Sequence, residues 1–301
     1  MNYKINRILL LPLISLLFSS TDFLQPYILA GETGKDVQTT LSMIKRSFFM
    51  NDQIQIIGEY SASGAGENYI LVLSNSDLDI ASLKGKYSSV YASVIRLAVF
   101  NKENQTYVAY QNPEYWGNLY FQSEYLMVEK HFLSFESKLR KSLPQMRGTF
   151  YRQFGSNQKF TSDKLHHYHY MFGMEYLEDS VLLGEFDSYE DAVNTIDKNL
   201  QLSSSCIKVF EKQIHGKNIK LYGIGLSGEK GEPHFMPIID INSPSHLAWL
   251  PYEVLVVENK VQMLHGRFRI AASFPDLTMM TFGKIMSTPS DIESQLKRLI
   301  Q

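Results

Sequence analysis

The sequence of 301 residues has only one cysteine, Cys206, and therefore cannot form an internal disulfide. It also lacks an excess of either charge, because 29 lysines and arginines face 31 aspartates and glutamates and the basic residues are scattered along the chain. This distribution excludes nucleic-acid binding, which needs a basic patch or stripe. A content of 44% hydrophobic residues is enough for packed cores, so the fold is expected to depend on those cores alone.

Long apolar runs are missing everywhere except near the N-terminus. There, Lys4 and Arg7 precede the apolar run 8–18, and small polar residues follow it at 19–21. This order is typical of a signal peptide, and the run is shorter than the roughly 20 residues that a membrane-spanning helix needs. The sequence predicts a signal peptide at 1–22 and an exported protein, periplasmic or secreted, with no membrane span after its removal.

An internal repeat is the most informative feature of the remaining chain. Two segments place apolar residues at i, i+4, i+7 and i+11, the spacing of a helix with one buried face. The first set is Val37, Leu41, Ile44 and Phe48, and the second is Tyr189, Val193, Ile196 and Leu200. This spacing predicts two copies of one domain rather than two unrelated ones.

Strand-like segments flank both helices in the same order. They are 27–32, 53–57, 69–73 and a hairpin of 94–100 with 105–110 in the first half, and 181–186, 207–210, 219–222 and a hairpin of 252–257 with 261–265 in the second. Prolines then introduce helices: a long one ending at Pro144, with Leu119, Leu126 and Leu133 on one side, and two shorter ones, 275–286 and 289–301.

The predicted fold class is therefore α+β, with two tandem copies of a small strand-helix-strands-helix domain. Each copy is expected to have an antiparallel or mixed sheet with helices on one face. The predicted boundaries are 23–146 for the first domain, 147–165 for a polar linker and 166–301 for the second domain. Such a chain can pack as an intramolecular pseudo-dimer.

Several stretches also resemble an exported bacterial family related to the proteins with domain of unknown function 302. They are Tyr27–Glu32, Ile57–Tyr60, Tyr110–Tyr115, His167–Met174, Leu250–Val256 and Arg269–Leu277, so the resemblance extends over nearly all of the mature chain. It implies the same α+β fold and no particular activity, because none is assigned to that family, and it supplies no catalytic residues.

A histidine-rich segment is the clearest candidate for metal binding. If residues 166–171 form a strand, His167, His169 and Met171 point to one face, where two imidazoles and a thioether suit copper or zinc. The alternative is that these side chains line a half-buried strand and form local hydrogen bonds.

The second half also holds groups from which an acid–base site could be built, although no complete catalytic constellation is present. They are Glu232, His234, Asp240, Arg267 and Arg269, with the two arginines placed on a strand.

The stretch Gly223–Gly228 has the letters of a dinucleotide fingerprint, but a loop rather than a helix is expected after it. Glycines of a strand or turn are therefore the better interpretation. Cys206 is expected to be a small buried side chain.

Aromatic residues crowd the end of the first half, where they either line a ligand pocket or fill the space between sheet and helix. They are Tyr107, Tyr110, Tyr115, Trp116, Tyr120, Phe121 and Tyr125.

Our preferred prediction is a periplasmic binding or accessory protein for a small ligand or soft metal, with its site near the interface of the halves or at the histidine segment. The alternatives are an enzyme that uses the His and carboxylate groups of the second half, and a structural protein that binds a protein partner.

Overall fold

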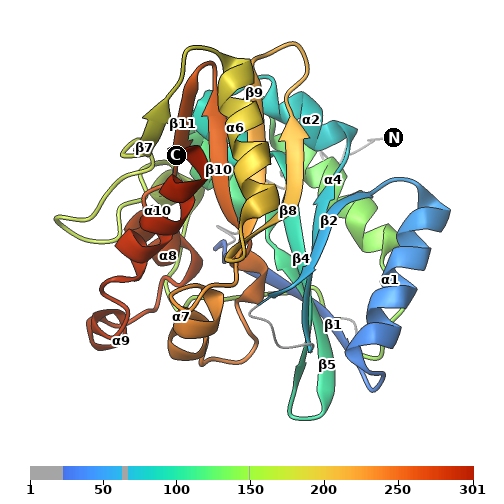
Figure 1. Ribbon diagram of the computed structural model, residues 1–301. Coiled ribbons are helices and arrows are strands. Elements are labelled where there is room, and N and C mark those ends of the chain that lie inside the picture. The colour runs from blue at the N-terminus through green and yellow to red at the C-terminus, as the bar shows by residue number, and fades with distance from the viewer. Residues whose placement is uncertain (1–22, 63–66, 149) are drawn as a thin grey trace, which may run out of the picture.

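The computed structural model describes residues 23–62, 67–148 and 150–301, so the predicted signal peptide lies outside the described residues. The chain forms an α+β fold with two antiparallel sheets, one from each half of the sequence (Figure 1). The first sheet has the strand order β2-β3-β4-β5-β1-β6, and the second has the order β7-β11-β10-β9-β8. Among the described residues, no helix is both long and apolar enough to cross a membrane.

The first half begins with strand β1 and helix α1, as the repeat predicted. Its strands are β1 (Tyr27–Thr33), β2 (Gln55–Ser61), β3 (Asn68–Ser74), β4 (Ile95–Lys102), β5 (Gln105–Gln111) and β6 (Arg152–Phe154). Its helices are α1 (Val37–Asn51), α2 (Ser76–Ser82), η2 (Tyr87–Ser93), α3 (Pro113–Phe121), η3 (Gln122–Met127), α4 (Glu129–Ser142) and α5 (Ser162–His166). Helix α1 packs against β2, β3 and β4.

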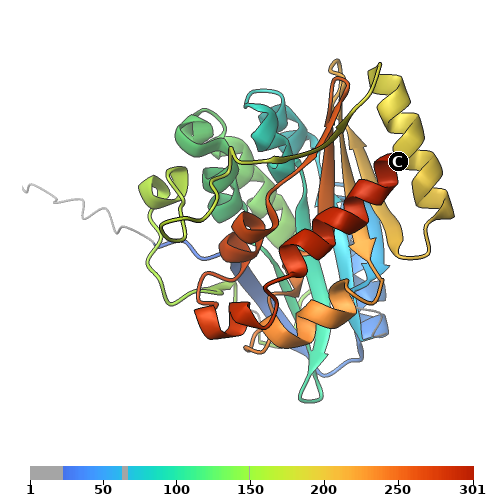
Figure 2. The ribbon, with the colours of Figure 1, turned by 60° about the vertical axis from the view of Figure 1, so that its left-hand side comes forward.

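The second half has the same order of its first elements. Its strands are β7 (Val181–Glu185), β8 (Cys206–Gln213), β9 (Ile219–Leu226), β10 (Tyr252–Val257) and β11 (Lys260–Met263). Its helices are α6 (Tyr189–Leu202), α7 (Glu232–Ile239), η4 (Leu247–Trp249), α8 (Gly266–Ser273), α9 (Met279–Gly283), α10 (Thr288–Lys297) and η5 (Arg298–Ile300). Helix α6 packs against β8, β10 and β11, while α7 and α9 lie at the other end of the half (Figure 2).

The two repeated helices bury the predicted faces. In α1 the side chains of Val37, Leu41, Ile44 and Phe48 are buried, and Asp36 caps the helix by accepting a hydrogen bond from the Thr39 amide. In α6 the predicted face is buried at Ile196 and Leu200, and Ser188 caps the helix in the same way. Both helices occupy the position between the first and second strands of their half, which is where the repeat placed them.

The register of the two sheets agrees residue by residue. Gly58, Val72 and Arg96 form one cross-strand row in the first sheet, and Phe210, Gly223 and Glu253 form the row at the same place in the second. A one-residue irregularity precedes Gly58 in β2 and Phe210 in β8. Five strands of the first sheet, β2-β3-β4-β5-β1, therefore follow the same order as the five strands of the second, β8-β9-β10-β11-β7, and the first sheet has β6 in addition.

The sheets meet along β2 and β8, which are in contact. A Cβ atom on Gly58 would lie 2.6 Å from the backbone oxygen of Val209 and 2.8 Å from the Cβ of Phe210, so the strands can approach only where β2 has glycine. The short 3-10 helix η4 of the second half also packs against β3, β4 and β5 of the first sheet. The core is thus continuous from one half to the other.

Two expectations need correction. The long helix expected before Pro144 is broken, because Gln122 adopts a left-handed φ of 53° between α3 and the turn η3. As a result Leu126 and Leu133 are exposed, and α4 instead buries Phe132, Phe135 and Leu139.

The second correction concerns the segment predicted as a linker, 147–165. It contributes strand β6, which pairs with β1, and nearly all of helix α5. The segment is polar and rich in Gly, Ser, Asn and Gln, which favoured a linker, but its backbone completes the edge of the first sheet.

Candidate functional site

The histidine segment is not a strand, so the premise of the metal prediction was wrong. Residues 162–166 form α5 and a series of turns follows, which removes the alternation that placed His167, His169 and Met171 on one face. His167 Nδ1 lies 3.1 Å from the backbone oxygen of Asp163. His169 stacks on Tyr176 and has Nε2 2.8 Å from the Met174 carbonyl. Among the described residues, no group of three or more His, Cys, Asp or Glu side chains is placed to hold a metal ion.

The acid–base groups of the second half are dispersed. Glu232 and Asp240 lie at opposite ends of α7, and His234 is exposed. The arginines are on helix α8 rather than a strand: Arg267 is 3.4 Å from Glu175, whereas Arg269 is buried. The predicted cluster therefore does not form one site.

The glycine-rich stretch serves packing. Gly223 and Gly225 lie within β9, where a Cβ atom would meet the rings of Phe210 and Tyr60 at 2.0 and 3.0 Å. Helix α7 does follow, contrary to the loop that we expected, but the buried Glu232 carboxylate accepts a hydrogen bond from the Leu226 amide at its start. The Glu232 carboxylate therefore links the end of β9 to the start of α7.

Cys206 and the aromatic group are structural. The Cys206 thiol is buried, which raises its pKa and makes it a poor nucleophile. Most of the aromatic side chains are buried, and the Tyr115 hydroxyl donates to the Ala272 carbonyl of the second half at 3.1 Å. These rings fill the contact between the halves rather than line a ligand pocket.

A buried ion cluster joins the two sheets. Glu253 of β10 forms ion pairs with Arg96 of β4 and Arg269 of α8, and all three side chains are at most 2% exposed. Arg269 also donates to the carbonyls of Trp249 and Pro251 at 2.5 and 2.7 Å. Burial, together with the nearby charge of Arg269, lowers the pKa of Arg96 to about 9. The cluster is closed to ligands and acts as a clamp between the halves.

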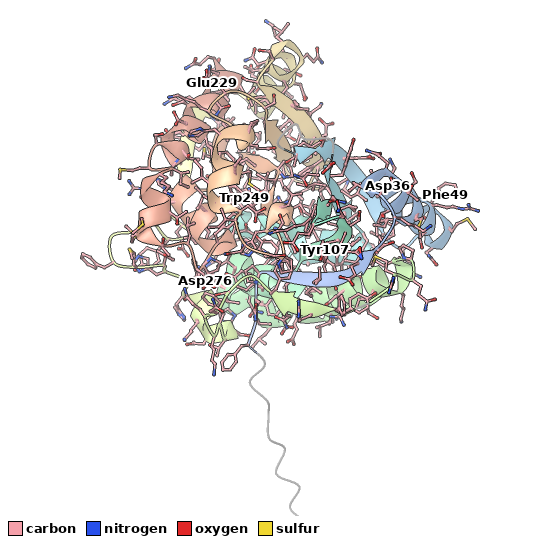
Figure 3. The ribbon with its side chains drawn as sticks, turned by 90° about the horizontal axis from the view of Figure 1, so that it is seen from below. Asp36, Phe49, Tyr107, Glu229, Trp249 and Asp276 are labelled. Atoms are coloured by element: carbon pink, nitrogen blue, oxygen red, sulfur yellow. The ribbon has the colours of Figure 1, made fainter. Side chains whose placement is uncertain are left out.

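The strongest candidate site is a polar depression at a different part of the junction. Its volume is about 550 Å³. One wall comes from the first half and the segment after it, and the other comes from the loop before η4 and the loop after α8. The lining residues include Gln25, Arg152, Gln153, Phe154, Ser156, Asn157, Asn242, Ser243, His246 and Asp276. Figure 3 labels Asp276 near the border between the ribbons of the two halves.

His246 is the central group of this depression. Its side chain is clamped between aromatic rings, with centroid distances of 4.8 Å to Phe274, 4.9 Å to Tyr27 and 5.9 Å to Phe154. Its Nδ1 lies 3.0 Å from the Ser273 carbonyl oxygen, which also accepts a hydrogen bond from the Tyr27 hydroxyl. Because a carbonyl only accepts, Nδ1 carries the proton of the neutral ring, and Nε2 keeps a lone pair.

Burial favours the neutral ring. It lowers the pKa of His246, although the nearby carboxyl of Asp240 opposes this shift. Asp240 is engaged elsewhere, because it accepts hydrogen bonds from the His246 amide and the Ser245 hydroxyl, and burial raises its pKa. Within the described part of the chain, Nε2 of His246 has no hydrogen-bond partner, and it is therefore available to a donor on a ligand.

A smaller hollow of about 160 Å³ adjoins the depression and shares Asn242, His246 and Asp276 with it. Its other walls come from α7, α9 and the loops beside them, and they include Ile239, Ile241, Phe274, Leu277, Thr278 and Thr281. The depression is thus lined mainly by polar groups, whereas the hollow has both polar and apolar walls, and His246 lines both.

Sequence reasoning missed His246 because the residues around it show no periodicity and no ligand spacing. The only available signal was a lone histidine after the turn residues Asn242, Ser243 and Pro244, and such a signal is too weak to predict a site. Searches of protein families, of curated proteins and of solved structures found no match to this chain.

Proposed function

We propose that this chain is an exported binding protein for a small polar ligand, which it holds in the depression between its two halves. The observation that supports this most is the His246 ring, which is 5% exposed and has Nδ1 bonded to Ser273, while Nε2 is left for a ligand. Nε2 is not one of the fully buried atoms that lack a partner, so it can be reached from the depression and can accept a hydrogen bond from a ligand. Export is supported by the N-terminal sequence pattern.

Binding fits this geometry better than catalysis. A nucleophile must lie within hydrogen-bond reach of its base, whereas the Ser245 hydroxyl beside His246 donates to Asp240 and accepts from the Leu247 amide. Asp240 contacts the backbone of His246 rather than its ring, so it does not orient the imidazole as the acid of a catalytic triad does.

The proposal includes a tandem origin of the two halves and their packing as an internal pair. Equivalent register positions support it, as do reciprocal contacts: Tyr60 of β2 donates to Glu232, and Lys212, at the same place in β8, pairs with Asp79 at 2.6 Å. We also propose, from the sequence resemblance alone, that the chain is related to the family with domain of unknown function 302. An internal pair explains why residues of both halves line a single depression.

Two variants of His246 test the function. His246→Asn keeps an N–H at the position of Nδ1, so its bond to Ser273 and the fold should survive, but it removes the acceptor at Nε2. His246→Gln can place its amide oxygen near the position of Nε2. We expect the Asn variant to lose at least tenfold in ligand affinity, and the Gln variant to retain more binding.

The measurement is native mass spectrometry of the mature protein after incubation with the fraction below 1 kDa of an extract of the cells that produce it. The wild type should carry one small-molecule adduct per chain, which His246→Asn should lose while its circular dichroism spectrum is unchanged. A wild type without an adduct, or an adduct that persists in His246→Asn, would contradict the proposal.

A further inference from the structure

The two compartments at His246 also indicate what kind of ligand fits them, an inference that rests on the proposed function. We infer that the ligand is a small carboxylate with a short apolar tail and a hydrogen-bond donor between them. The carboxylate faces Arg152, the donor faces Nε2 of His246, and the tail enters the hollow between α7 and α9.

The polar compartment has a cation available to an anionic group. Arg152 of β6 is exposed, and no acidic side chain of the described residues lies within ion-pair distance of it. Its planar guanidinium matches a carboxylate with two parallel hydrogen bonds.

Asp276 is the acid of the same depression, and its oxygens are already used. Oδ1 accepts from the Ser156 hydroxyl at 3.0 Å, and Oδ2 accepts from the amide and side chain of Asn157 at 2.6 and 2.9 Å. These bonds hold the turn of residues 155–157 against the second half. The ammonium group of Lys102 donates a hydrogen bond to the Asn242 carbonyl at 2.9 Å. Burial raises the pKa of Asp240, and the charge of Lys102 opposes part of this rise. The unengaged charge at the depression is therefore that of Arg152.

The adjoining hollow has apolar walls beside polar ones, and the tail is assigned to the apolar walls. Ile239, Phe274 and Leu277 present apolar surface there, and its volume of about 160 Å³ limits the tail to a few carbon atoms. Each buried methylene tightens binding by about fourfold. Because Asn242, His246 and Asp276 line both compartments, a ligand that fills both lies beside His246.

The test uses three probes, measured by isothermal titration calorimetry with the full mature protein. The first is 2-hydroxy-4-methylpentanoate, which carries all three features. Its amide removes the charge, and lactate removes most of the tail. We expect the first probe to bind at least tenfold more tightly than either of the others.

Variants assign each part of the probe to a compartment. Arg152→Gln should reduce the affinity for 2-hydroxy-4-methylpentanoate to that for its amide, whereas Arg147→Gln, an exposed arginine outside the depression, should change nothing. Thr281→Phe should fill the adjoining hollow and weaken the long probe at least fivefold, without changing the affinity for lactate.

The inference is overturned if the amide or lactate binds as well as the full probe, if no probe binds, or if Arg147→Gln has the effect of Arg152→Gln. Its failure is distinguishable from failure of the proposed function. If only the inference about the ligand fails, His246→Asn still removes the adduct obtained from the extract. If the proposed function fails, His246→Asn does not remove an adduct.

Discussion

At the scale of residues, the molecule contains two buried polar centres of opposite character. In the first, Glu253 is paired with Arg96 and Arg269, so that desolvation of the three charges is offset by their contacts. In the second, His246 stays neutral and keeps one nitrogen without a partner among the described residues. The first centre holds the halves together, and the second is open to a ligand.

Removing the charge of Glu253 should be strongly destabilising. Glu253→Gln leaves two buried guanidinium groups without a counter-charge, so we expect the free energy of unfolding to fall by about 3–5 kcal/mol. Urea titration followed by circular dichroism measures this change. Glu59→Gln is the control, because its partner Lys45 is exposed, and it should lose less than about 1 kcal/mol. Equal losses in the two variants would show that Glu253 does not hold the halves together.

At the scale of elements, β2 and β8 determine how the sheets meet. Both are edge strands with an irregularity at the same place, and they touch where β2 has Gly58. Exposed edge strands are open to pairing with other chains, and here each edge is covered by the other half. The contact is close because Gly58 has no Cβ atom and faces the backbone of Val209 and the Cβ atom of Phe210, while the ring of Phe210 covers Gly223.

A methyl group on Gly58 should separate these strands. Its Cβ would lie 2.6 Å from a backbone oxygen, which cannot move aside as a flexible side chain can. We expect Gly58→Ala to lower the free energy of unfolding by about 1–3 kcal/mol, as overpacking does elsewhere. Gly34→Ala is the control, because a Cβ atom there meets nothing within 4 Å. Thermal melts of the two variants give the comparison, and a Gly58 variant as stable as the control would contradict the close contact.

At the scale of the whole molecule, the halves are expected to unfold together. Besides the ion cluster, Tyr27 and Tyr115 of the first half donate to the carbonyls of Ser273 and Ala272 in α8, and η4 packs on the first sheet. Opening the junction would expose all these buried groups at once, which makes a state with one folded half unfavourable.

The two tryptophans allow this to be tested. Trp116 lies in α3 and Trp249 in η4, so Trp116→Phe and Trp249→Phe each leave a fluorescent probe in one half. In each variant, the urea transition of the remaining fluorescence should coincide with that of the circular dichroism signal. Separate transitions in either variant would show that the halves are independent units.

The sequence alone was sufficient for most of the regular elements. Helical spacing located α1 and α6, and alternation with turn residues located the strands of both sheets, because these signals lie within a few neighbouring residues. Helices α2, α7 and α8 were missed, since they have only seven or eight residues each and show no extended apolar period. The exposure of Leu126 likewise followed from a backbone break at Gln122 that no apolar spacing reveals.

Only the tertiary structure determined the site and the junction. Arg96 and Glu253 are 157 positions apart, and His246 gains its environment from Tyr27 and Phe154, which are distant in the chain. Side chains so far apart in the sequence come together only when the two sheets pack. The periodicity of neighbouring residues therefore does not predict their contact. Short-range periodicity in the sequence specified the main helices and strands of each half, whereas the packing of the halves determined which charges are paired and which nitrogen of His246 has no partner among the described residues.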